Sequence, residues 1–115
     1  MDKTGPTNPE LRKLISDLRE SWKKNKADLW KVVAKELEKP TRQRREVNIL
    51  SINKNTKPNE TIIVPGKVLG TGEMDHKVKV AAWQFSAAAK QKVNAMSIYD
   101  LIKENPKGKD VRIIG

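Results

Sequence analysis

The single histidine, His76, lies close to Glu73 and Asp75, and such a group can provide acid–base catalysis or metal ligands. No nucleophile pattern accompanies these residues, and acidic side chains are common in turns because they hydrogen-bond to the local backbone. The chain has no cysteine, which excludes disulfides, thiolate zinc sites and thiol catalysis. We therefore expect no enzyme, no metal site, no cofactor and no small-molecule substrate, with His76 structural or exposed to solvent.

A glycine-rich segment, Pro65-Gly66-Lys67-Val68-Leu69-Gly70-Thr71-Gly72-Glu73, has the composition of loops whose backbone amides face a phosphate. Its spacing matches neither the NTPase phosphate loop nor the dinucleotide fingerprint. Glycines also permit tight turns with no ligand at all. The sequence predicts a structural turn made by Pro65, Gly66, Gly70 and Gly72, and a phosphate contact by Lys67 stays open.

Positive charge is the strongest functional signal of the sequence. Its 115 residues include 24 Lys and Arg against 14 Asp and Glu, a formal net charge of +10, which favours a polyanionic partner. The run Lys39-Pro40-Thr41-Arg42-Gln43-Arg44-Arg45 holds four cations and no acid, and guanidinium groups suit phosphate oxygens. A membrane partner would need a basic amphipathic helix or a lipid anchor, and the sequence shows neither. The residues predicted to bind the phosphates of a nucleic acid are Lys39, Arg42, Arg44, Arg45, Lys54, Lys57, Lys67 and Arg112.

The tryptophans offer a second way to bind nucleic acid, by stacking on bases. Trp22 continues the apolar stripe of a predicted helix and Trp83 lies in an alternating strand, so both are expected in or near the core. Trp30 lies beside the stripe of its helix. No set of exposed aromatic residues on a sheet is evident, and we expect recognition through phosphates and shape.

The length allows one domain, residues 1–115. Apolar residues at helical spacing predict helices over about 9–24 and 27–38, which form an N-terminal helical pair. A basic loop, predicted to contact nucleic acid, is assigned to 39–46 and an α/β core to 47–115. The N-terminus lacks the apolar run of a signal peptide, so the mature chain is expected to begin near residue 1, in a reducing compartment.

Within the core, the pattern predicts short strands alternating with helices. Residues 47–52 are too few to distinguish a strand from a helical turn. The strand that begins at Thr61 is expected to end at Pro65-Gly66, and Ser86 and Ser97 are expected to cap helices. The further predicted elements are strands at 77–85 and 111–114, and helices at 87–93 and from 97 to about 104. The fold class is therefore a mixed α/β domain of irregular strand-strand-helix units carrying the N-terminal helical pair.

Several of these stretches resemble one known family. They are Asn8-Pro9 with Leu11, Leu37-Glu38-Lys39-Pro40, Val47-Asn48, Glu60-Thr61 through Val64-Pro65-Gly66-Lys67-Val68-Leu69-Gly70, Val80-Ala81-Ala82, Phe85-Ser86 and Val111-Arg112-Ile113-Ile114. Across almost the whole chain the sequence resembles the archaeal and eukaryotic large-subunit ribosomal protein family L eighteen e, a fold relative of bacterial L fifteen. The short length resembles the archaeal members.

The resemblance implies a cytoplasmic ribosomal protein that binds and stabilises folded large-subunit ribosomal RNA, contacts neighbouring ribosomal proteins and has no catalytic role. The family's RNA-contacting run maps onto Lys39, Arg42, Arg44 and Arg45. Residues 53–59 depart from the family pattern, which weakens the case for Lys54 and Lys57. The alternative from another class is a free-standing nucleic-acid chaperone or DNA-compacting protein that uses the same charge without a fixed site.

Overall fold

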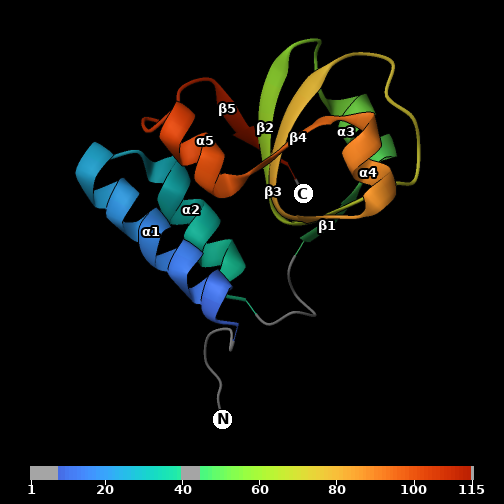
Figure 1. The fold of residues 1–115 in the computed structure, drawn as a ribbon. Coiled ribbons are helices and arrows are strands. Elements are labelled where there is room, and N and C mark those ends of the chain that lie inside the picture. The colour runs from blue at the N-terminus through green and yellow to red at the C-terminus, as the bar shows by residue number, and fades with distance from the viewer. Residues whose placement is uncertain (1–7, 40–44, 115) are drawn as a thin grey trace.

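A computed structural model describes residues 8–39 and 45–114, in which five helices and five strands follow one another (Figure 1). In chain order they are α1 (Pro9–Asn25), α2 (Asp28–Leu37), β1 (Arg45–Asn48), α3 (Ile49–Asn55), β2 (Glu60–Leu69), β3 (Val78–Phe85), α4 (Ala87–Lys92), β4 (Asn94–Ser97), α5 (Ile98–Glu104) and β5 (Val111–Ile113). The mixed α/β class and the N-terminal helical pair are confirmed. Within the described ranges, no helix is long and apolar enough to cross a membrane.

Local sequence signals set where several helices begin and end. The Asn8 side chain caps α1 by accepting from the backbone N–H of Glu10 at 2.8 Å. Lys26 ends α1 in the left-handed conformation, and its N–H donates to the Trp22 carbonyl at 2.7 Å. The predicted caps of α4 and α5 are confirmed, because Ser86 and Ser97 each accept a backbone N–H from the first turn that follows.

All strand pairs in the sheet are parallel, in the order β1-β2-β3-β4, and β5 also pairs with β2. Since β3 runs along one edge of β2, both β1 and β5 must occupy the opposite edge. They pair with different parts of β2: β5 lies beside Thr61–Ile63, and β1 lies beside Gly66–Leu69. The strand β2 is thus the central element, and its amino and carboxyl halves have different neighbours.

The predicted end of this strand at Pro65-Gly66 is wrong, because β2 continues to Leu69. Proline has no N–H to give to a ladder, and a sheet tolerates it only where pairing is interrupted. Pro65 lies at such a point on both edges. On one edge β5 stops opposite Ile63 and β1 starts opposite Gly66, and on the other the pairing with β3 shifts register between Val64 and Lys67. Pro65 and Gly66 therefore form a buried irregularity inside a strand and not a turn.

Helices cover both faces of the sheet, and each face has its own apolar core. One core joins α1, α2 and α5 to Ile63 and Ala81, with Trp30 fully buried in it. The other joins α3 and α4 to Ile62 and to residues of β1, β2 and β3 on the opposite face. Consecutive residues of β2 thus supply opposite layers, as the alternation of side chains along a strand requires. Figure 1 shows the two groups of helices on either side of the sheet.

Two further elements differ from the sequence prediction. The ambiguous segment 47–52 divides, since Val47 belongs to β1 and Ile49 opens α3. Arg45 and Glu46, assigned to the basic loop, are already in β1. The strand β4 was not predicted, because Asn94–Ser97 has neither the β-branched residues nor the alternation of a typical strand and is held by pairing with β3.

Candidate nucleic-acid interface

The basic run leads into the carboxyl half of the sheet. Arg42 and Arg44 lie outside the described residues. Arg45 begins β1 opposite Gly66, and the next pair in the register is Glu46 with Lys67. The strand pairing therefore brings the end of the basic run beside Lys67, although 21 positions separate Glu46 from Lys67 in the sequence.

Lys39, the first cation of the run, follows the end of α2. Its Nζ lies 3.0 Å from Oε2 of Glu36, one turn back on the helix. The Lys39 side chain is about two-fifths exposed, whereas the side chain of Glu36 is mostly buried. Lys39 therefore remains accessible to a stronger external anion.

Lys67 lines an open groove of about 900 Å³ that lies at the carboxyl ends of β2 and β3 and extends along β4, here named the carboxyl-end groove. Its lining residues are Lys67, Ala82, Trp83, Gln84, Phe85, Lys90, Val93, Asn94, Ala95, Met96, Ser97 and Asp100. In open parallel sheets, ligands bind outside the carboxyl ends of the strands. Neither Lys67 nor Lys90 forms an ion pair with another described residue, so both positive charges can act on an external anion.

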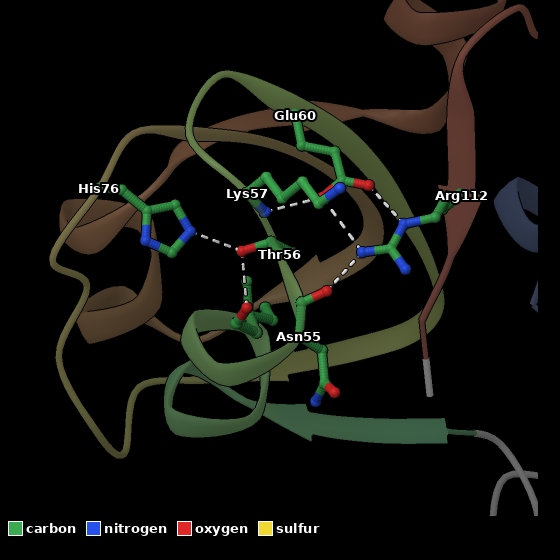
Figure 2. A network of polar contacts seen from close by, with 7 residues as sticks. Asn55, Thr56, Lys57, Glu60, His76 and Arg112 are labelled. Carbon is green, nitrogen blue, oxygen red and sulfur yellow. Dashed lines mark hydrogen bonds and ion pairs between the residues drawn. The ribbon is translucent and has the colours of Figure 1, made fainter.

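Near the amino half of β2, by contrast, positive charge is paired within the protein (Figure 2). Arg112 of β5 forms a two-pronged ion pair with Glu60, in which Nη2 lies 3.1 Å from Oε1 and Nε donates to Oε2. The same guanidinium donates to the backbone carbonyl of Asn55. The hydrogen bonds from Arg112 are the main reason that the pKa of Glu60 falls below its ordinary value, and they raise the pKa of Arg112. Arg112 is therefore committed to this internal network.

Lys54 and Lys57 lie near the same network, Lys54 in the last turn of α3 and Lys57 just after the helix. Both side chains are exposed. The backbone N–H of Lys57 donates to Oε1 of Glu60 at 2.9 Å. Lys67 follows Glu60 by seven positions along the extended strand, a span of roughly 23 Å. Among the predicted cations that the structure describes, Lys67 lies at the carboxyl half of β2, and Lys54, Lys57 and Arg112 lie near its amino end.

The two later glycines of the predicted turn lie in the loop that follows β2, where each permits a close approach. A Cβ on Gly70 would lie 2.5 Å from the Cβ of Ala88 in α4. Gly72 has φ +108°, and a Cβ there would lie 2.5 Å from the backbone nitrogen of Leu50 in α3. These glycines hold the loop between two helices and so have a packing role.

Lys92 of α4 fastens this loop. Its Nζ donates to the carbonyls of Gly70 at 2.8 Å and Gly72 at 2.7 Å, and lies 3.3 Å from Oε2 of Glu73. The sequence shows Lys90 and Lys92 only as two cations of one helix. The fold gives them different roles, because one faces the carboxyl-end groove and the other binds the protein's own backbone.

His76 is mostly buried, and its side chain contacts Thr56, the residue that follows α3 (Figure 2). The hydroxyl of Thr56 donates to the Ile52 carbonyl at 2.7 Å, and its oxygen lies 2.7 Å from Nε2 of His76. Nδ1 lies 2.6 Å from the carboxylate of Asp75, and this hydrogen bond is the main cause of the lowered pKa of Asp75. No cluster of three or more His, Asp or Glu side chains able to hold a metal occurs in the described part of the chain. The geometry gives His76 a structural role.

The sequence reasoning missed most of the carboxyl-end groove. Trp83 packs against the core as expected, but the sequence did not indicate that it also lines the groove, as does Phe85 of the predicted strand. Asn94 was missed because it belongs to the unpredicted strand β4. No local signal marks these residues, since parallel pairing alone brings the three strands together.

Comparisons with known proteins agree with the resemblance noted in the sequence. Residues 23–97 match a family model described as "Ribosomal proteins 50S-L15, 50S-L18e, 60S-L27A". The chain is 48% identical to the large ribosomal subunit protein eL18 of Sulfurisphaera tokodaii, over 97% of this chain and 96% of the relative.

Two further relatives carry the same name. The protein of Methanothermobacter thermautotrophicus is 44% identical, over 94% of this chain and 93% of its own length. That of Archaeoglobus fulgidus is 48% identical, over 94% and 97%. A family match over more than half of the chain and archaeal relatives that align almost end to end lead to one conclusion: the chain belongs to this family of large-subunit ribosomal proteins.

Proposed function

We propose that the chain is a structural constituent of the large ribosomal subunit that stabilises folded ribosomal RNA by neutralising phosphates at the carboxyl half of its sheet. In this proposal Arg42, Arg44, Arg45 and Lys67 form the principal contact, with Lys39 beside them. Lys54 and Lys57 form a second, separate contact. The protein acts in the cytoplasm as part of the ribosome, next to other large-subunit proteins, and catalyses no reaction.

One observation carries the proposal: the register of β1 against β2. It places Arg45 opposite Gly66 and Glu46 opposite Lys67, so the end of the basic run and an unpaired lysine share one end of the sheet. Clustered cations repel one another, and a phosphate backbone removes that repulsion. At the other end, Arg112 already has Glu60 as its counter-charge.

The salt dependence of binding tests which cations meet phosphates. Each neutralised phosphate contributes roughly 0.7 to 0.9 to the slope of log affinity against log salt. We expect the triple variant Arg42→Ala, Arg44→Ala, Arg45→Ala to reduce that slope by about 2 to 3 on a large-subunit ribosomal RNA fragment. The thermal midpoint of the free protein should hardly change.

A control with the same change in net charge separates a local site from general attraction. Lys23, Lys24 and Lys35 are exposed residues of α1 and α2, and helices tolerate alanine well. Their triple alanine variant should keep nearly the wild-type slope. Equal losses in both variants would show that the net charge matters and the basic run does not.

Association with the intact particle distinguishes a constituent from a free-standing chaperone. An integral protein should sediment with large subunits after a high-salt wash. A chaperone or DNA-compacting protein should wash off and bind duplex DNA as well as it binds ribosomal RNA. The second outcome would overturn the proposed function.

A further inference from the structure

The three tryptophans differ in how their indole N–H groups are satisfied. Trp22 donates to the Asp28 carboxylate at 3.0 Å, and Trp30 donates to the carbonyl of Pro106 at 2.6 Å. Trp83 makes no such hydrogen bond to any residue in the described ranges. A tryptophan that is partly buried usually finds a partner for its N–H. Trp83 therefore keeps an unused donor and part of its ring surface at the wall of the carboxyl-end groove.

Two side-chain amides in the same wall are also without partners. Gln84 and Asn94 are exposed, and neither amide is hydrogen-bonded within residues 8–39 and 45–114. An amide offers both a donor and an acceptor, and such pairs read the edges of unpaired bases in RNA recognition. The groove thus combines a partly exposed aromatic surface with unused donors and acceptors.

The charges of the groove are separated along β3. Lys67 is paired in register with Gln84, and Ser97 is paired with Ala82, two residues earlier on β3 and roughly 7 Å away. Asp100, the only acid of the lining, lies one turn beyond Ser97 in α5. A phosphate is therefore favoured at the Lys67 end, and a group with hydrogen-bond donors at the Asp100 end.

We propose, building on the RNA-binding function above, that the carboxyl-end groove receives one unpaired nucleotide of the ribosomal RNA. The base stacks on Trp83, its edge meets the amide of Gln84, and its phosphate lies near Lys67 and Lys90, whereas Asn94, paired in register with Lys79, lies farther along the groove. The volume of about 900 Å³ is within the range of small-ligand sites. Protein recognition of single-stranded RNA commonly pairs aromatic stacking with cations along the backbone.

The experiment compares two RNA hairpins with the same stem, one fully paired and one with a single-nucleotide bulge. Wild-type protein should bind the bulged hairpin more tightly. Trp83→Leu should reduce that preference roughly five- to 150-fold, the range that one stacked base contributes. Trp22→Leu, which replaces a tryptophan that also is partly exposed but lies outside the groove, should keep the full preference.

Trp83 also packs against the core, so Trp83→Leu could reduce binding by destabilising the fold. A second variant that changes only an exposed side chain separates these two causes. Gln84 is exposed, so Gln84→Ala should leave the thermal midpoint unchanged and still lower the preference several-fold. Equal binding of the two hairpins by wild-type protein, or an undiminished preference in both groove variants, would overturn the nucleotide site. The response to the Arg42, Arg44 and Arg45 substitutions tests the proposed function separately, because the groove variants leave the basic run unchanged.

Discussion

The cations near the two halves of β2 differ in whether they have an acidic partner within the protein. At the amino half, Arg112 is held by Glu60 and by a backbone carbonyl, so its charge is balanced inside the protein. At the carboxyl half, Lys67 and Lys90 have no acidic partner among the described residues, and the basic run enters the sheet beside Lys67. Net charge alone does not separate the two groups. The difference shows that a cation's use depends on the neighbours that the fold gives it.

The loop after β2 shows the same contrast over a shorter distance. Lys92 donates hydrogen bonds to the carbonyls of Gly70 and Gly72, whereas Lys90, two residues before it, lines the carboxyl-end groove. Lys92 therefore stabilises the loop after β2, and Lys90 is available to bind RNA in the proposed function. Four predictions, from the largest expected effect to the smallest, test this division.

The largest effect is expected from Gly72→Ala. A Cβ there would meet the backbone of Leu50 at 2.5 Å, and φ +108° is strained for any residue with a side chain. We expect a loss of about 2 to 4 kcal/mol in the free energy of unfolding, measured by urea denaturation. The control is Gly108→Asn, because φ +63° suits asparagine and the nearest atom is the flexible end of Leu29. Similar losses in both variants would show that backbone packing at the carboxyl half is not special.

Lys92→Met should come next, with a loss of roughly 1 to 2 kcal/mol, since methionine keeps the apolar stem and removes the charged hydrogen bonds to the loop. Lys90→Met should leave the urea midpoint unchanged and weaken RNA binding. If Lys90→Met destabilised the protein as much as Lys92→Met, the proposed division of roles would be wrong.

RNA affinity should distinguish Lys67 from Arg112. Lys67→Met should reduce the salt slope by roughly 0.7 to 0.9, the contribution of one phosphate contact. Arg112→Met should leave the slope unchanged, because Arg112 is committed to Glu60 and Asn55. A reduced slope for Arg112→Met would show that the amino half also meets RNA.

The smallest effect concerns pH. The pKa of Glu60 is lowered in the folded protein by its hydrogen bonds from Arg112, so the folded state favours the carboxylate more than the unfolded chain does. This contribution is complete above the ordinary carboxyl pKa and disappears as the pH falls through the lowered value. Because Arg112 is largely exposed, we expect it to be below about 1 kcal/mol. Thermal melts of Glu60→Gln from neutral to acidic pH should show a correspondingly weaker loss of stability on acidification, and a pH profile identical to wild type would contradict this assignment.

The local signals of the sequence were sufficient for the helices. Ser86 and Ser97 cap the helices that they were predicted to cap, and Asn8 caps α1, because a cap needs only backbone groups within three residues. The apolar stripe of α1 was also confirmed, since Leu11, Leu14 and Leu18 are buried. These features depend on neighbours along the chain.

The sheet was predicted less completely. Pro65 and Gly66 have the local character of a strand end, and only the positions of β1, β3 and β5 show why the strand continues through them. The four residues of β4 are a strand because β3 pairs with them. Sequence patterns report local preference, and parallel pairing joins segments that are far apart in the chain.

The sequence by itself determined the α/β class, the helical pair, the cationic character and, through its family motifs, the resemblance to a large-subunit ribosomal protein. Only the tertiary structure decided which cations are balanced internally and which face outward. It also decided that Trp83 lines a groove, whereas Trp30 is buried. The reason is physical: composition is a property of the chain, but an ion pair or a groove requires side chains that the fold brings within a few ångströms of one another.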